Sequence, residues 1–289
     1  MIYFRFLDIR AYLIAYIIIS FFGLCIGSFL NVCIYRLPLE DKEERSLVKK
    51  SSHCPKCGAK IRFYDNVPLF SWLFLRGKCR SCKEPISKRY PLVECLNWIA
   101  YLLVLTFVDV QYYPVHAVTL ALFFSVLIVI GFIDYDTMEI YPGQLMLIVI
   151  LAVISALFSD TISIPERIIG GLAISAPFFI IGEVSRVIIR KKTGEDYRGI
   201  ELGDTLLMLV SGLLIGTKCI CASAIIGIFS AAIIGVINKL GGKDSKFAFG
   251  PYLAFGLVFG SIFGEQMIDW YLGLFKYPEE IGIYAMMIH

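Results

Sequence analysis

Eight long apolar segments constrain this chain more than any other feature of its sequence. Several reach the length of about 20 apolar residues that a helix needs to cross the hydrocarbon core of a bilayer. Hydrophobic residues make up 58% of the chain, against roughly 45–50% in an ordinary soluble domain, and the alternation typical of a membrane barrel is absent. The sequence therefore predicts an all-α polytopic membrane protein with about eight transmembrane helices. The predicted spans are residues 11–35, 90–109, 115–134, 142–158, 166–189, 203–218, 219–238 and 248–270.

The first apolar segment carries Arg5 and Arg10 ahead of it, as a secretory signal peptide would. However, it lacks an evident small-residue cleavage site, and it leads directly into further predicted spans. We therefore expect residues 1–35 to form a retained first transmembrane helix.

Lys and Arg are concentrated between alternate spans. Residues 36–89 hold 14 of the 27 basic residues and residues 186–198 hold five more, whereas the connections 107–114 and 158–166 are nearly free of them. The positive-inside rule then places the basic segments, together with residues 239–246, in the cytoplasm and both termini outside. These loops account for the net charge of +3. We expect them to contact anionic membrane lipid, and the charge requires no nucleic-acid partner.

Residues 36–90 are predicted to form a small cytoplasmic module in the first loop. The pairs "CPKC" and "CRSC" are separated by 21 residues, which is the spacing of a four-thiolate zinc site, and Gly58 suits the sharp turn that such a pair requires. Disulfides are the alternative, but cytoplasmic thiols stay reduced, and so small a module has too little core to fold alone. The zinc is expected to be structural, because four thiolates leave no open position. Its predicted ligands are Cys54, Cys57, Cys79 and Cys82.

Aspartates stand at the ends of two predicted membrane helices. Asp134 closes one span, and Asp204, in "ELGD", opens a later span on the same predicted side. A charged residue costs roughly 2.5–3.5 kcal/mol at the centre of a membrane helix and less near the interface. Taken alone, Asp204 reads as a first-turn acid favoured by the helix dipole, and Asp136 as a solvated loop acid. Two carboxylates at equal depth on different helices can, however, face each other across a bundle.

Such a pair suggests acid–base chemistry. Like charges held close do not both ionise, so one carboxyl keeps its proton while the other accepts one, as in aspartic proteases. Gly203, beside Asp204, would let a substrate backbone approach closely. No P-loop or dinucleotide-binding pattern indicates a different enzyme. A zinc-stabilised transporter or scaffold is the competing hypothesis, but the internal repeats typical of transporters are not visible.

The chain resembles the type IV prepilin peptidases over nearly its whole length. The similarity rests on the opening segment "GLCIGSFLNVCIYRLP", the cytoplasmic module, two aspartate motifs and a last-span motif. These are residues 23–38, residues 54–94, "FIDYDTMEIYP", "ELGD" and "FGPYLAFG". In combination the five stretches are highly specific.

This resemblance implies a multi-pass enzyme of the bacterial cytoplasmic membrane with its active site facing the cytoplasm. The enzyme would remove the short basic leader of prepilins and pseudopilins, whose N-terminal helix is apolar, and then methylate the new N-terminus with S-adenosylmethionine. By the same resemblance, Asp134 and Asp204 are the catalytic acids. Residues 36–90 are associated with the methyltransferase, and residues 91–289 form the peptidase core.

The chain departs from the family pattern at three places. Glu201 stands where the GxGD motif has its first glycine, Leu206 replaces a common lysine, and the first motif gains one residue and carries Gly143 where an aspartate is usual. The added residue leaves Asp136 as an alternative to Asp134, which keeps the "FID" context. A peptidase without methyltransferase activity also stays open, because no separate donor-binding fold is visible in the sequence.

Overall fold

The computed structural model describes residues 9–41, 43–47, 52–242 and 248–275. In these residues the chain is helical, and its only β-type pairing is two isolated bridges in the module. The long helices are α1 (Ile9–Arg36), α3 (Arg89–Phe107), α4 (Pro114–Thr137), α5 (Pro142–Phe158), α6 (Ile164–Thr193), α7 (Leu202–Leu240) and α8 (Gly250–Gly273). The short helix α2 (Phe70–Phe74) lies in the module. The predicted all-α class is confirmed.

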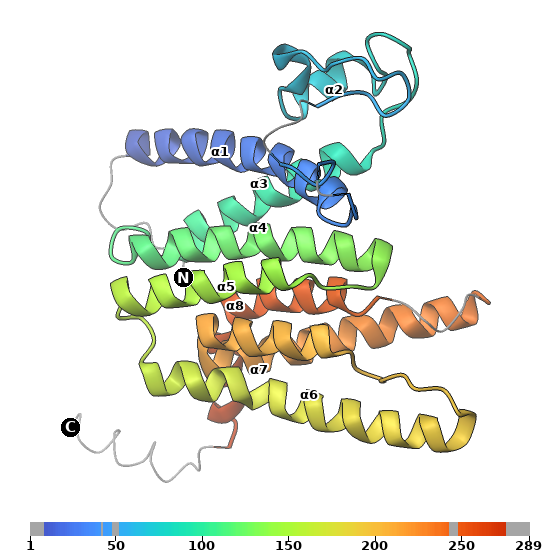
Figure 1. Ribbon diagram of the computed structural model, residues 1–289. Coiled ribbons are helices and arrows are strands. Elements are labelled where there is room, and N and C mark those ends of the chain that lie inside the picture. The colour runs from blue at the N-terminus through green and yellow to red at the C-terminus, as the bar shows by residue number, and fades with distance from the viewer. Residues whose placement is uncertain (1–8, 42, 48–51, 243–247, 276–289) are drawn as a thin grey trace.

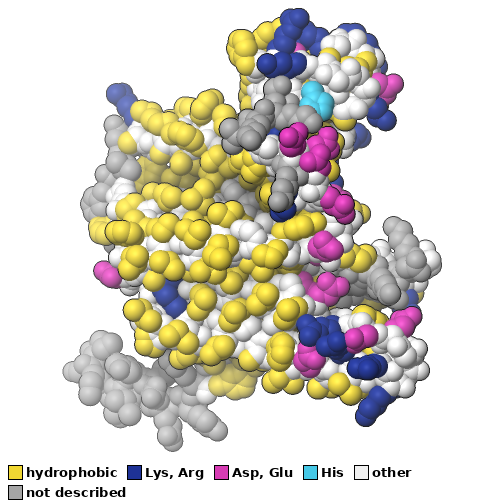
Figure 2. Space-filling model, viewed as in Figure 1, with side chains coloured by type: hydrophobic (Ala, Val, Ile, Leu, Met, Phe, Trp, Pro, Cys, Tyr) yellow, Lys and Arg dark blue, Asp and Glu magenta, His cyan; other side chains and the backbone are white. Residues whose placement is uncertain are grey.

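The long helices lie side by side in one bundle (Figure 1). Five of them, α1, α3, α4, α6 and α7, are long and apolar enough to cross a membrane, and α5 is a shorter apolar helix. Hydrophobic side chains cover the flank of the bundle, while charged side chains gather mainly at one end and on the module (Figure 2). This arrangement is the one expected of a polytopic membrane protein. Arg5, the two termini and part of the loop 239–246 lie outside the described residues.

Helix α7 contains two of the predicted spans. Gly216 interrupts it with a non-helical backbone, φ 79° and ψ 178°. The first half packs against α6 so closely that a Cβ on Gly212 would lie 2.2 Å from the carbonyl oxygen of Gly170. The second half packs against α8, where Gly227 meets Leu253 near the start of that helix. The chain therefore reverses direction at Gly216, which reconciles seven long helices with about eight predicted spans.

A buried arginine supports this reversal. Arg167, in the first turns of α6, is only 4% exposed. Its Nη1 donates to the carbonyl oxygens of Leu213 and Leu214 at 3.1 and 3.3 Å, and its Nη2 donates to Ser155 Oγ at 3.0 Å. A helix break inside a membrane leaves carbonyl groups without partners unless side chains satisfy them. Arg167 supplies donors just before the break at Gly216.

Helix α4 is the central element of the bundle. More than half of its apolar stretch is buried, a larger share than in the other four candidate spans. Phe123, Phe124 and Ile130 have no exposed surface. Because α4 contacts α1, α3, α5 and α8, its C-terminal turn is held at the meeting point of several helix ends. That turn carries Asp134.

The module is attached to a tightly packed helix pair, α1 and α3 (Figure 1). Asn97 Nδ2 donates to the carbonyl oxygen of Gly23 at 2.7 Å, and Asn31 Nδ2 donates to that of Tyr90 at 3.1 Å. These amide bonds between the helices fix the two points, the end of α1 and the start of α3, from which the module projects.

Candidate active site and metal centre

Asp134 lies in the last turn of α4 and is 5% exposed. The helix ends at Thr137, and the next residue, Met138, adopts a left-handed backbone and donates its N–H to the Asp134 carbonyl oxygen. The Asp134 carboxylate accepts the backbone N–H of Gly250, with 2.8 Å between N and Oδ2. Gly250 is the first residue of α8, and the positive end of a helix dipole favours a neighbouring carboxylate. A Cβ on Gly250 would lie 2.6 Å from Oδ2, so the glycine makes this approach possible.

Asp204 lies in the first turn of α7 and is 6% exposed. Its carboxylate lies near the backbone of Glu201, the residue before the helix, and within electrostatic range of Asp134. The structure therefore brings the two predicted acids together, from different helices, at one end of the bundle. The space beside Gly203 is taken by Ile140, whose Cβ would lie 3.2 Å from an added Cβ. Close approach of a substrate backbone there would require Ile140 to move.

Asp136 has different surroundings. Its side chain is 41% exposed and pairs with Arg89 of α3, with 2.6 Å between Oδ2 and Nη1. The same guanidinium donates to the carbonyl oxygen of Phe132 and lies over its ring. Asp134, by contrast, shares a buried environment with Asp204.

Glu201 and Gly250 are two neighbours of the acids to which the sequence alone assigns no role. Glu201, at the place of the family glycine, is exposed and acts electrostatically on both aspartates. Sequence reasoning noted the "FGP" stretch but assigned no role to Gly250, because the contact of Gly250 with Asp134 joins residues far apart in the chain.

The four cysteines of the module converge on one point. All four Sγ atoms lie within 4.8 Å of one another, and those of Cys54 and Cys82 are 3.9 Å apart. Tetrahedral zinc with Zn–S bonds of about 2.3 Å requires sulfur atoms about 3.8 Å apart. The predicted set thus fits a metal ion of this kind.

The backbone of the two cysteine pairs explains how they converge. Gly58 donates its N–H to the Cys54 carbonyl oxygen at 2.8 Å, and Lys83 donates to that of Cys79 at 3.0 Å. Gly58 has φ +69° and Lys83 has φ +63°. Both pairs therefore form the same sharp turn, and the turn predicted at Gly58 is confirmed. In the second pair a lysine adopts the backbone that favours glycine.

Comparison with known proteins divides the chain into two parts. Residues 21–108 match the Bacterial Peptidase A24 N-terminal domain, and residues 121–237 match the Type IV leader peptidase family. The first part contains the module and the second contains both aspartates.

Curated relatives cover most of the chain. A prepilin leader peptidase/N-methyltransferase of Neisseria gonorrhoeae is 32% identical over 255 residues, 80% of this chain and 84% of the relative. Another, of Dichelobacter nodosus, is 32% identical over 284 residues, 86% of this chain and 92% of the relative. A third, of Aeromonas hydrophila, is 31% identical over 281 residues. No solved structure matches the chain significantly.

Proposed function

The chain belongs to the type IV leader peptidase family, and from that premise we propose that it cleaves the leader peptides of type IV prepilins and pseudopilins and methylates the exposed N-terminus. The relatives are named for both activities. One observation carries the peptidase assignment. Asp134 and Asp204 are both buried, on separate helices, within electrostatic range of each other.

This pair supplies a base and an acid. Two close carboxylates in a buried site do not both carry a charge, so one keeps its proton. The anionic carboxylate takes a proton from water as the water oxygen bonds to the scissile carbonyl carbon, and the protonated carboxyl donates its proton to the carbonyl oxygen. When the C–N bond breaks, the leaving amine takes back the proton that came from water. Asp134 is the better candidate than Asp136, which is paired with Arg89 at the surface.

The position of the pair suits a substrate that is itself a membrane helix. Both acids lie at the charged end of the bundle (Figure 2), so a scissile bond just outside the membrane would reach them. Glu139 and Glu201 are exposed nearby and would favour a basic leader. The excess of Lys and Arg in the loops at this end supports a cytoplasmic active site in the bacterial inner membrane.

The module would hold zinc and serve the methyltransferase. Four thiolate bonds to a zinc ion would supply folding energy that so small a module lacks. S-adenosylmethionine, when bound, supplies an electrophilic methyl group. The division of the chain between two family models supports separate parts for cleavage and methylation.

Purified protein in lipid nanodiscs, incubated with a prepilin with and without S-adenosylmethionine, tests both halves by mass spectrometry. We expect loss of the leader in both reactions and the added mass of one methyl group only with the donor. Cleavage without methylation would leave a peptidase alone. If neither product forms, the assignment is overturned in favour of a transporter or scaffold.

A further inference from the structure

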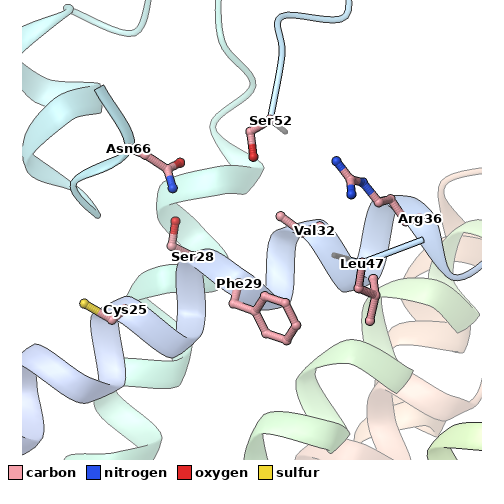
Figure 3. A pocket seen from close by; sticks show the side chains of 8 residues that line it. All are labelled: Cys25, Ser28, Phe29, Val32, Arg36, Leu47, Ser52 and Asn66. Carbon is pink, nitrogen blue, oxygen red and sulfur yellow. The ribbon is translucent and has the colours of Figure 1, made fainter. Parts of the chain in front are cut away.

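A cavity of about 340 Å³ opens between α1 and the module (Figure 3). Its volume falls in the range of roughly 300–1,000 Å³ that is typical of small-molecule sites. Ser28 of α1 and Asn66 of the module face each other across it, with Arg36 to one side and Phe29 below. The lining thus combines hydroxyl, amide and guanidinium groups with an aromatic ring.

This cavity belongs to the N-terminal part of the chain. Its lining residues lie between Cys25 and Asn66, inside the match to the N-terminal domain and outside the match to the peptidase family. It is therefore built from different residues than the aspartate pair. The hydrophobic cluster that includes Leu47 of the lining also includes Ile133, the neighbour of Asp134, which connects the cavity to the end of the bundle where cleavage would occur.

A buried carboxylate that the peptidase mechanism does not use joins the walls of the cavity. Glu94 of α3 is 7% exposed and accepts the backbone N–H of Leu69 at 2.8 Å. The side chain of Ser28 contacts the same carboxylate. Glu94 thus connects α1, α3 and the module. Leu69 has φ +58° and ψ −51°, a backbone that L residues rarely adopt and that persists where the surroundings impose it, often at functional sites.

The chemistry of the lining matches a nucleoside amino acid that carries a positive charge. The guanidinium of Arg36, anchored on the carbonyl oxygen of Ser46, suits a carboxylate. Hydroxyl and amide side chains suit ribose hydroxyls, and the ring of Phe29 suits a purine. The Glu94 carboxyl, behind Ser28, holds in place the hydroxyl that lines the cavity.

We propose that this cavity binds the methyl donor, S-adenosylmethionine, and that Glu94 positions its walls. The inference rests on the proposed methyltransferase function. In the reaction, the lone pair of the new N-terminal amine forms an N–C bond with the methyl carbon while the S–C bond breaks. S-adenosylhomocysteine leaves with that electron pair on sulfur, and the amine proton passes to water.

Binding, measured without turnover, tests the proposal. Calorimetry in nanodiscs should give similar binding of S-adenosylmethionine to the wild type and to Glu40→Gln, which removes an exposed carboxylate. Asn66→Ala and Phe29→Ala should each weaken binding about tenfold. Leader cleavage by the same samples should be unchanged, which shows that the variants fold.

Glu94→Gln provides a readout that a purely structural role would not move. It keeps an acceptor for the N–H of Leu69, whereas Glu94→Ala does not, so binding of S-adenosylmethionine should survive in Glu94→Gln and fall in Glu94→Ala, with leader cleavage unchanged in both. Equal binding by the wild type and the cavity variants would overturn the site while leaving the methyltransferase intact. If lipid copurifies with the wild type but not with Asn66→Ala, and donor binding is the same in both, the cavity is a lipid site. A wild type that neither binds donor nor methylates would instead remove that half of the proposed function.

Discussion

The backbone N–H of Gly250 donates to Oδ2 of Asp134 across 2.8 Å, which ties the first residue of α8 to the last turn of α4. Asp204 likewise lies at the start of a helix, in the first turn of α7 and near the backbone of Glu201. Both carboxylates therefore lie beside helix starts, where backbone N–H groups lack partners within the helix. The bond from Gly250 orients Asp134 through the backbone, so its geometry is sensitive to small changes in the backbone.

Replacing Gly250 with alanine should abolish most leader cleavage. The added Cβ would lie 2.6 Å from Oδ2 of Asp134, so the carboxylate or α8 must shift, and a displacement of about 1 Å costs roughly 10²-fold in rate. Gly143→Ala is the matched control, because Gly143 also lies in the first turn of a helix and has nothing within 4 Å of an added Cβ. Initial rates on a prepilin should separate the two variants. Equal rates would show that the Gly250–Asp134 contact does not set the active geometry.

Protein purified without added metal should contain about one zinc per chain, because the four convergent cysteines would form a closed four-thiolate site. Cys79→Ser should lose the metal and expose the module to protease, whereas Cys25→Ser, outside the four-cysteine set, should retain both. Elemental analysis and limited proteolysis provide the readouts. Full activity and an ordered module in a zinc-free preparation would refute the site.

Arg167→Met should lower the thermal stability of the bundle. It removes the donors that satisfy the carbonyl oxygens of Leu213 and Leu214, and each buried polar group left without a partner costs about 1–3 kcal/mol. Arg190→Met, at the exposed end of the same helix, should have little effect. Unfolding in detergent, followed by circular dichroism, gives the comparison. Identical midpoints would mean that water or lipid satisfies these carbonyls.

The sequence predicted what local patterns encode. The cysteine spacing, the apolar segments and the placement of Asp134 and Asp204 each depend on residues close together in the chain or on a repeated side preference. The contacts of Gly250 with Asp134 and of Arg167 with α7 join distant segments of the chain. No local sequence pattern predicts such contacts. Glu94 was missed for the same reason. Glu94 contacts Leu69, 25 residues away in the chain, and Ser28 on another helix.

The module should face the cytoplasm and the connection between α3 and α4 should face outside, as the Lys and Arg distribution predicts. Phe70→Cys and Tyr112→Cys place probes at exposed positions, 57% and 73% exposed. A membrane-impermeant thiol reagent should label the second in intact cells and the first only after permeabilisation. Both probes are introduced into a protein that keeps the four metal cysteines and in which the other native cysteines are replaced. These are Cys25, Cys33, Cys95, Cys219 and Cys221. The reverse labelling pattern would place the aspartates on the wrong side for a cytoplasmic leader.

Asp134→Asn and Asp204→Asn should each abolish leader cleavage. Asparagine is nearly isosteric with aspartate but can be neither the base nor the acid, and loss of acid–base catalysis costs at least about 10²–10⁴-fold. Asp136→Asn breaks only a surface pair with Arg89 and should retain most activity. Mass spectrometry of a prepilin reaction measures cleavage, and methylation of a pre-cleaved substrate should survive in all three variants and show that they fold. A dead Asp136→Asn with an active Asp134→Asn would move the first acid to position 136 and keep the mechanism, whereas normal cleavage by both Asp134→Asn and Asp204→Asn would remove the mechanism itself.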